Sequence, residues 1–275
     1  MKRRLPGFLV LGGMKAGTTT LKHYLRQHPQ IHFHHTEIHF FEKDELYVLG
    51  TEWYANHFTD AATGQIVGEK TPAYGYSAVA AARIAVELPD VKLVWILRNP
   101  VDRAYSNYWH VVNSGEELSS FEDAVHRELD EGLQPPGRAY CARSRYVDQI
   151  RTYLQHFPRE QMCFLFLEEL NADPASELGR LYRFLGVEPH MPKDMTIKHR
   201  TRIPKNTVVQ HFLRRVVRRL FGRRVYRRIK RFNQRPQHGY PRMSDALRSR
   251  LLAHFAPYNE DLFALVGRKP RGWDA

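Results

Sequence analysis

The sequence predicts an α/β fold, a three-layer P-loop-like arrangement in which helices flank a central, mainly parallel sheet. Three observations lead to this prediction. Short apolar runs of strand length recur along the chain, at 8–11, 66–68, 91–97 and 162–167. Longer helix-compatible stretches separate these runs, as the crossovers between parallel strands require. The first run leads into a glycine-rich turn that opens a helix, where backbone amides converge on an anion.

The turn after the first predicted strand has the spacing of a phosphate-binding loop. Gly12 and Gly17 are separated as in the GxxxxG of a Walker A motif. Thr18, however, stands where that motif requires lysine, and the lysine of the loop is Lys15. A helix is predicted over 18–27. The spacing therefore predicts a phosphate site, and the displaced lysine argues against an ordinary P-loop kinase.

Capping and breaking residues define the remaining elements. Ser77 and Ser119 are predicted to cap two helices, and Gly186 to end a third. A proline-rich break is expected at 134–137, irregular chain over 189–205 and a loop over 233–243. The predicted helices cover 53–58, 77–88, 102–113, 119–131, 144–156, 174–185, 208–231 and 244–266.

Because parallel strands end at one edge of a sheet, the loops starting at Gly12, Gly68 and Arg98 are expected to share one cleft.

Composition indicates a soluble globular protein, and the length suits one large domain or two small ones. Because no internal repeat, low-complexity tract or long linker occurs, one domain, residues 1–275, is the preferred prediction. No apolar run approaches the roughly 18 to 20 residues that cross a bilayer, and we expect a cytoplasmic protein. Cys141 and Cys163 are too few for a disulfide framework. The net charge of +13 is concentrated in a basic, helical C-terminal region of about 207–275, because residues 207–232 hold ten Lys or Arg and no Asp or Glu.

Four motifs occur in an order that resembles a known enzyme family. They are Lys15–Thr20, Glu37–Phe41, Gly68–Tyr74 and Leu97–Ser106. Together they resemble the sulfotransferases that use 3′-phosphoadenosine 5′-phosphosulfate (PAPS), and in particular the glucosaminyl branch of the heparan-sulfate enzymes with its bacterial relatives. A thinner similarity continues through Tyr146, and the fragment Gly239–Pro241 is similar to the end of the family's cofactor-covering loop.

The resemblance implies a site for PAPS as donor and for PAP as product, without a metal. The loop would bind the 5′-phosphosulfate through Lys15, Ala16, Gly17, Thr18, Thr19 and Thr20. Arg98 and Ser106 would bind the 3′-phosphate. Tyr146 would add a cofactor contact, and Arg235 would replace the Gly-Arg pair that the family carries in its covering loop.

The resemblance also implies the catalytic groups. Glu69 is the predicted general base, and Lys15 would neutralise the charge that grows on the leaving group. The structural alternative for Glu69 is an ion pair with Lys70. Glu37 is expected to face the acceptor, although Thr36 before it replaces a lysine of the animal enzymes, which argues against a heparan-like acceptor.

Four histidines, His32, His34, His35 and His39, invite a metal interpretation. Their alternation with apolar residues instead favours an extended strand at a sheet edge, and no cysteine or paired carboxylate completes a ligand set. We therefore expect no metal, and His39 is interpreted as part of the cleft wall.

Three functions compete at this point. The first is sulfuryl transfer to a hydroxyl or amine of a carbohydrate, lipid or small-metabolite acceptor, and the second is a P-loop nucleotide-dependent kinase. The third is a non-catalytic membrane- or nucleic-acid-binding protein that uses the basic helix 212–232. For that helix, packing through its apolar stripe is the structural alternative to binding an anionic acceptor or a membrane surface, and nucleic acid is the weakest candidate partner.

Overall fold

The computed structural model describes residues 4–133, 138–196, 202–236 and 239–273. By its internal contacts the chain divides into two compact units. The first unit comprises Met1–Asn99, Arg145–Lys198 and Ala256–Ala275, and the second comprises Pro100–Ser144 and His199–Phe255. The count of one domain stays a prediction.

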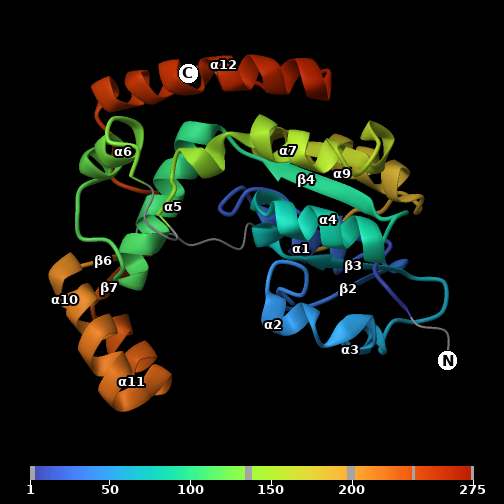
Figure 1. Cartoon of the computed structure of the whole chain (residues 1–275), viewed down its shortest axis with the longest axis horizontal. Coiled ribbons are helices and arrows are strands. Elements are labelled where there is room, and N and C mark those ends of the chain that lie inside the picture. Colours follow the sequence, from blue (N-terminus) through green and yellow to red (C-terminus); the bar gives the residue numbers. More distant parts are fainter. Residues whose placement is uncertain (1–3, 134–137, 197–201, 237–238, 274–275) are drawn as a thin grey trace. The chain divides into compact units, whose positions relative to one another are not determined.

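A five-stranded parallel sheet forms the centre of the first unit (Figure 1). Its strands lie in the order β2-β3-β1-β4-β5, and every neighbouring pair is parallel. The strands are β1 (Phe8–Val10), β2 (Ile31–Phe33), β3 (Ile66–Lys70), β4 (Lys92–Leu97) and β5 (Met162–Phe166). The predicted parallel sheet is confirmed, and β2 is an edge strand as the histidine pattern indicated.

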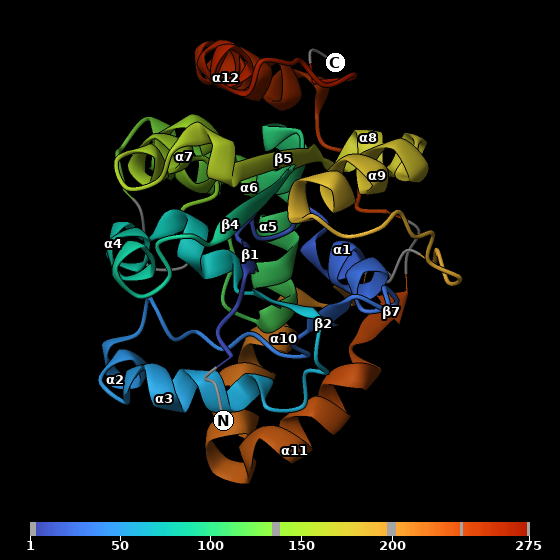
Figure 2. The same cartoon turned by 90° about the vertical axis from the view of Figure 1, so that its right-hand side faces the viewer.

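Helices cover both faces of this sheet, which gives the three predicted layers. Figure 2 shows α1 (Thr18–Leu25) and α9 (Pro174–Leu185) on one side of the strands and α4 (Ala78–Glu87) and α7 (Tyr146–Leu154) on the other. Side chains of β4 alternate between the two faces of the sheet and contribute to the hydrophobic core on each. Leu93 and Trp95 belong to one cluster, and Val94 and Ile96 belong to the other.

Short helices complete the first unit. They are α2 (Asp44–Tyr47), α3 (Gly50–Ala55), α8 (Leu167–Ala172) and the 3₁₀ turns Asn56–Phe58, Pro72–Tyr76 and Arg159–Gln161. Two predicted helix ends are confirmed in this unit. The Ser77 hydroxyl accepts a hydrogen bond from the amide of Ala80 at the start of α4, and Gly186 ends α9 in the left-handed conformation.

The second unit is mainly helical. Its elements are α5 (Pro100–Ser114), α6 (Phe121–Leu129), the 3₁₀ turn Ala142–Ser144, α10 (Thr207–Phe212), α11 (Arg218–Phe232) and the first part of α12 (Asp245–Val266). Buried residues of α5, α6 and α12, among them Val112, Val125 and Leu251, form its core. A short antiparallel pair, β6 (Arg202–Pro204) and β7 (Gln234–Pro236), brackets α10 and α11.

Three predictions for the second unit are wrong. The cap of α6 is Ser120, because its side chain and that of Asp123 form a reciprocal capping box. The stretches 189–205 and 233–243, expected to be irregular chain and a loop, are so over most of their described residues. The expectation is wrong at 202–204 and 234–236, which form β6 and β7. The helix expected over 208–231 is interrupted by the π-helical turn Leu213–Val217 and by Gly222, whose φ of 77° is outside helical geometry.

Two predictions remain, the proline-rich break and the lack of a membrane-spanning segment. The break predicted at 134–137 lies outside the described residues. Among the residues that the structure describes, no helix has the length and apolar character needed to span a bilayer.

Gly68 provides a test of the strand register. A Cβ at this position of β3 would stand 2.2 Å from the ring of Phe8, its partner on β1. We expect Gly68→Ala to lower the free energy of unfolding by about 1–3 kcal/mol in a urea titration, because the extra methyl overpacks the sheet. In the matched control Gly179→Ala, on α9, the nearest atom is the end of the Arg183 side chain at 3.7 Å. That change should stabilise the protein by about 0.5–1 kcal/mol. Equal effects of the two substitutions would contradict the pairing of β1 with β3.

Candidate functional site

Three neighbouring strands end at one edge of the sheet, and a predicted site segment follows each of them. β1 lies between β3 and β4, and all three run in the same direction. The glycine-rich loop follows β1, Thr71 follows β3, and Arg98 follows β4. The three segments therefore follow strand ends at one edge of the sheet, and the single cleft expected there stays a prediction.

The loop after β1 has the backbone geometry of an anion site. Gly12 and Gly17 have φ angles of 36° and 91°, and Gly17 is the residue before α1. A Cβ at Gly17 would stand 2.5 Å from Leu167, so glycine is required for close packing as well. The amides of the first turn of α1, at Thr18, Thr19 and Thr20, have no acceptor within the helix. They are available to an anion at the helix start.

Lys15 adopts a strained conformation inside this loop. Its φ of 76° is left-handed, and His39 is the other described non-glycine residue with a positive φ. Such outliers persist where the surrounding structure holds them, often at functional sites. Burial, and secondarily the charge of Arg98, lower the pKa of Lys15. The fold therefore holds a cation here under electrostatic strain, which an arriving anion would relieve.

Arg98 is fixed beside the loop. Its guanidinium donates a hydrogen bond to the Lys15 carbonyl at 3.3 Å, and its own carbonyl accepts one from the Tyr146 hydroxyl at 3.0 Å. The next amide, of Asn99, donates to Glu168 Oε1 at 2.9 Å. Among the described residues neither Lys15 nor Arg98 forms an ion pair with a carboxylate. Two cations thus lie close together, and no described carboxylate pairs with either of them.

Glu69 lies in the interior. Its relative exposure is 0%, and its two carboxyl oxygens accept hydrogen bonds from the hydroxyls of Tyr54 at 2.9 Å and Thr71 at 2.8 Å. Burial raises the pKa of Glu69 to about 7, although these hydrogen bonds act in the opposite direction. Because successive residues of a strand point to opposite faces, Lys70 turns away from it.

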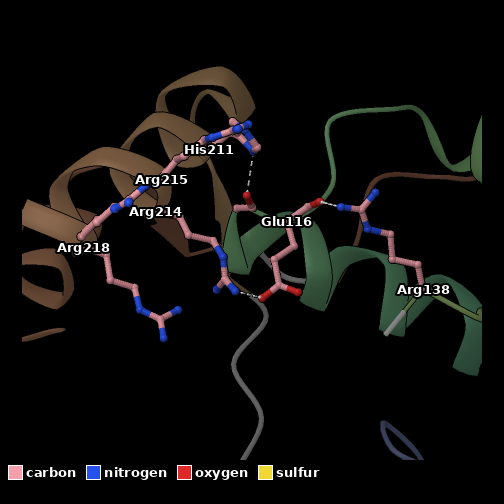
Figure 3. A pocket seen from close by; sticks show the side chains of 8 residues that line it. Glu116, Arg138, His211, Arg214, Arg215 and Arg218 are labelled. Atoms are coloured by element: carbon pink, nitrogen blue, oxygen red, sulfur yellow. Dashed lines mark hydrogen bonds and ion pairs between the residues drawn. The ribbon is translucent and has the colours of Figure 1, made fainter. Parts of the chain in front are cut away.

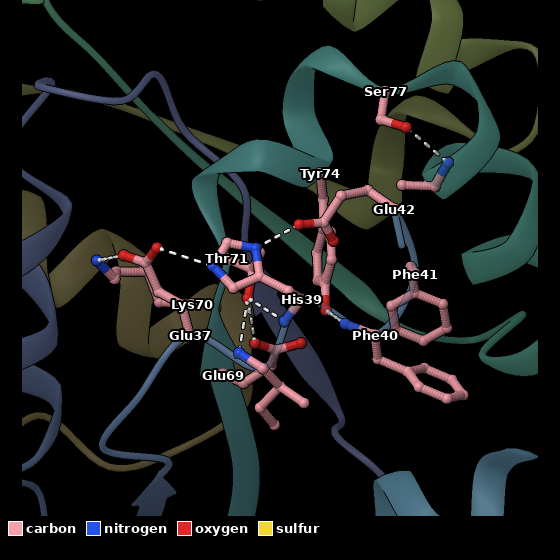
Figure 4. A network of polar contacts seen from close by, with 12 residues as sticks. Glu37, His39, Phe40, Phe41, Glu42, Glu69, Lys70, Thr71, Tyr74 and Ser77 are labelled. Atoms are coloured by element: carbon pink, nitrogen blue, oxygen red, sulfur yellow. Dashed lines mark hydrogen bonds and ion pairs between the residues drawn. The ribbon is translucent and has the colours of Figure 1, made fainter. Parts of the chain in front are cut away.

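Lys70 instead pairs with Glu37. Its Nζ is 2.5 Å from Glu37 Oε1, and the Glu37 side chain retains 39% of its exposure (Figure 4). The Nε2 atom of His39 is 3.6 Å from the other Glu37 oxygen. The alternative that Glu69 and Lys70 form an ion pair is therefore wrong, and the accessible carboxylate of this edge is Glu37.

The segment that carries Glu37 is held against β3 by two hydroxyls. Thr71 Oγ1 accepts hydrogen bonds from the amides of Ile38 at 3.2 Å and His39 at 3.5 Å, and the Tyr74 hydroxyl accepts one from Phe40 at 2.9 Å. His39 pairs with Glu42, and the hydrogen bond to that carboxyl raises the pKa of His39. Sequence reasoning did not assign roles to Tyr54, Thr71, Tyr74 or Glu42. Thr71 and Tyr74 lie inside the Gly68–Tyr74 motif, which was the available signal.

His32 and His34 have individual partners. The Nε2 atom of His32, on the edge strand, is 3.2 Å from Asp60, and that of His34 is 3.0 Å from the Thr36 hydroxyl. Burial lowers the pKa of His34 to about 4. No group of three or more potential metal ligands occurs in the ranges that the structure describes.

Ser106 and Arg235 belong to the second unit. The Ser106 hydroxyl, on α5, is 3.1 Å from that of Tyr240, within the fragment similar to the family's covering loop. Arg235 lies exposed on β7, where its backbone pairs with Ile203. Their roles as cofactor-binding residues stay predictions, as do those of the six loop residues, Arg98 and Tyr146.

The second unit also contains a basic pocket of about 410 Å³ that was not predicted (Figure 3). Glu116 lies in it 2.5 Å from Arg214, and His211 Nδ1 is 2.9 Å from the Gly115 carbonyl. The lining residues are Gly115, Glu116, Arg138, His211, Arg214, Arg215, Arg218 and Arg219. The run of positive charge at 207–232 indicated that arginines gather in this segment. It did not predict the contacts of the segment with Gly115 and Glu116, which follow α5.

Comparisons with known proteins agree with the sequence motifs. Residues 5–211 match the family model described as a sulfotransferase domain. A mouse protein described as heparan sulfate glucosamine 3-O-sulfotransferase 6 is 33% identical over 275 residues, which cover 99% of this chain and 75% of the relative. A second mouse protein, heparan sulfate glucosamine 3-O-sulfotransferase 3B1, is 36% identical over 186 residues, or 68% of this chain.

The coverage and the solved structures extend this result. The match covers 47% of the second relative, so the chain spans about half the length of that protein. The crystal structure of a sulfotransferase from Alicyclobacillus acidocaldarius covers 98% of this chain and 99% of its own, with a TM-score of 0.73 and 27% identity. The family model matches well over half of the chain. The chain therefore belongs to the sulfotransferase family.

Proposed function

We propose that this protein transfers a sulfuryl group from PAPS to a hydroxyl or amine of an acceptor. The observation that carries the proposal is the sheet edge itself. There, a glycine loop with two cations unpaired by the described carboxylates, Lys15 and Arg98, neighbours a half-exposed carboxylate, Glu37. An in-line transfer needs both features, because negative charge develops on the leaving phosphate while the attacking oxygen or nitrogen loses a proton.

On the donor side, the loop amides and the first-turn hydroxyls of α1 would receive the 5′-phosphosulfate. As the bond between sulfur and the bridging oxygen breaks, Lys15 would neutralise the charge left on that oxygen, and PAP would leave. Arg98 would hold the 3′-phosphate through its fork of donors, with Ser106, Tyr146 and Arg235 as further proposed contacts.

On the acceptor side, the base must touch the group that attacks sulfur. Glu69 was the predicted base, but its exposure of 0% and its two hydroxyl partners favour a positioning role. Glu37 is accessible and lies between Lys70 and His39. We therefore assign proton removal to Glu37 and retain Glu69 as the second candidate.

The relatives support one class of acceptor as the first candidate. Two similar proteins are described as heparan sulfate glucosamine sulfotransferases, so a saccharide is the acceptor that we propose first. Lipid and small-metabolite acceptors remain alternatives. Transfer from labelled PAPS and from labelled ATP to a panel of these acceptors tests the proposal directly. Productive use of ATP alone would replace it with the kinase hypothesis.

The two carboxylates can be distinguished by matched substitutions. Glu37→Gln should lower kcat by roughly 10²- to 10⁴-fold, the usual contribution of a general base. Glu69→Gln should keep kcat within about tenfold, because its hydroxyl partners can still bond an amide. Rates measured with saturating PAPS decide between them, and the reverse ranking would restore Glu69 as the base.

The raised pKa of Glu69 predicts a pH-dependent cost to stability. The folded state disfavours the ionised form, so stability is full below the unfolded pKa of about 4.5 and falls as the pH rises through about 7. Glu69→Gln removes this ionisation. Its stabilisation relative to wild type should therefore be about 2 kcal/mol larger at pH 8 than at pH 5 in denaturant titrations. The exposed control Glu45→Gln should show no such change, and a pH-independent difference would contradict the buried environment of Glu69.

Lys15 and Arg98 should separate catalysis from cofactor binding. Lys15→Ala removes a charge needed mainly in the transition state, so we expect a roughly hundredfold or larger loss of kcat. Arg98→Ala removes a fork to a phosphate that is bound throughout, so PAP affinity should fall by about tenfold or more in calorimetry. Unchanged PAP affinity in the Arg98 variant would exclude it from the cofactor site.

A further inference from the structure

The basic segment, residues 207–232, exposes large apolar side chains. Leu220, Phe221 and Phe232 are 69%, 63% and 75% exposed. Five more are exposed in the same segment, Val208, Val209, Phe212, Val225 and Ile229. Only Leu213, Val217 and Tyr226 form a buried cluster there among the described side chains. The structural alternative, in which the apolar stripe packs against the protein, is therefore wrong for most of the stripe's members.

The exposed residues of α11 follow helical spacing. Val225, Ile229 and Phe232 follow Gly222 and are separated by four and three residues, which gathers them along one side of the helix. Phe221 lies before Gly222, whose non-helical backbone interrupts the helix, and it is exposed as well. Exposed arginines adjoin the stripe at neighbouring positions, Arg224, Arg228 and Arg231. The result is a helix with an apolar side bordered by cations, both open to solvent.

The segment carries strong and mostly uncompensated charge. It has ten Lys or Arg and no Asp or Glu. Arg214 is paired with Glu116, and Lys230 is half-buried beside the ring of Tyr226. The remaining described cations make no hydrogen bond or ion pair with described residues, namely Arg215, Arg218, Arg219, Arg224, Arg227, Arg228 and Arg231. Three of these line the basic pocket (Figure 3).

We infer that the basic segment docks on an anionic phospholipid surface. Its apolar side would enter the boundary between headgroups and acyl chains while the arginines contact lipid phosphates. A second copy of this chain docked on the same segment would place ten cations opposite ten others, which would repel each other. RNA or a sulfated saccharide would use the charge but would leave the exposed phenylalanines unexplained. A lipid surface uses both properties, and the inference is independent of the proposed transfer reaction.

Vesicle flotation of the full chain tests this docking surface. The probes are vesicles of phosphatidylcholine alone and of phosphatidylcholine with phosphatidylglycerol at about three to one. We expect binding to the anionic vesicles at physiological salt and at least tenfold weaker binding to the neutral ones. Failure of the wild-type protein to bind anionic vesicles would overturn the inference. Binding to RNA or heparin without binding to anionic vesicles would overturn it as well.

Two variants separate the contributions. Phe221→Ser with Phe232→Ser keeps every charge, and Arg224→Gln with Arg228→Gln keeps the apolar side. Each should weaken vesicle binding by about tenfold or more. The control Val48→Ser with Val86→Ser changes equally exposed apolar residues elsewhere and should bind like wild type.

Circular dichroism and light scattering complete the test by showing that each variant keeps its helix content and association state. Wild-type vesicle binding by the phenylalanine variant would refute a role for the apolar side. Conversion of a dimer to a monomer by that variant would instead identify a second copy as the occupant.

Discussion

The hydrogen bond between Thr71 and Glu69 is the interaction on which the acceptor side of this site depends. The Thr71 hydroxyl donates to the buried carboxyl and accepts from the amides of Ile38 and His39. One hydroxyl thus ties the end of β3 to a segment some thirty residues earlier in the chain. Loss of the hydroxyl would leave the Ile38 amide without this partner, and burial makes an unsatisfied amide expensive. Burying the Glu69 carboxyl is unfavourable, and a role in holding the Thr71 hydroxyl in place is consistent with its position in the core.

Two carboxylates of this site therefore differ through their surroundings. Glu69 sits among hydroxyls in the core, and burial raises its pKa to about 7. Glu37 sits at the surface of the same sheet edge, paired with the cation of Lys70. Alternation along β3 sends neighbouring residues 69 and 70 to opposite sides. That geometry separates a buried hydrogen-bond acceptor, Glu69, from a solvent-accessible carboxylate, Glu37.

The sequence predicted what depends on local rules. Strands such as β4 were found because a continuous apolar run between polar turns predicts a buried strand, and the loop after β1 was found from its glycine spacing. Sequence reasoning could not predict that Glu69 is buried while Glu37 is exposed. The surroundings of Glu69 include residues distant in the chain, such as Tyr54. Nor did helical periodicity reveal the break in the basic segment, since Gly222 is tolerated in many helices and its φ of 77° depends on context.

The displacement of the loop lysine has a physical consequence for the choice of ligand. In a Walker A loop the lysine lies at the helix start and reaches the terminal phosphates of a nucleotide. Here Lys15 precedes the helix in a left-handed conformation, and the Arg98 guanidinium bonds its carbonyl. Burial, and secondarily the charge of Arg98, lower the pKa of Lys15, so an anion beside this lysine would stabilise its charged form. With Arg98 as a second cation after the neighbouring strand β4, the arrangement is consistent with the proposed donor, which carries two separate anionic groups.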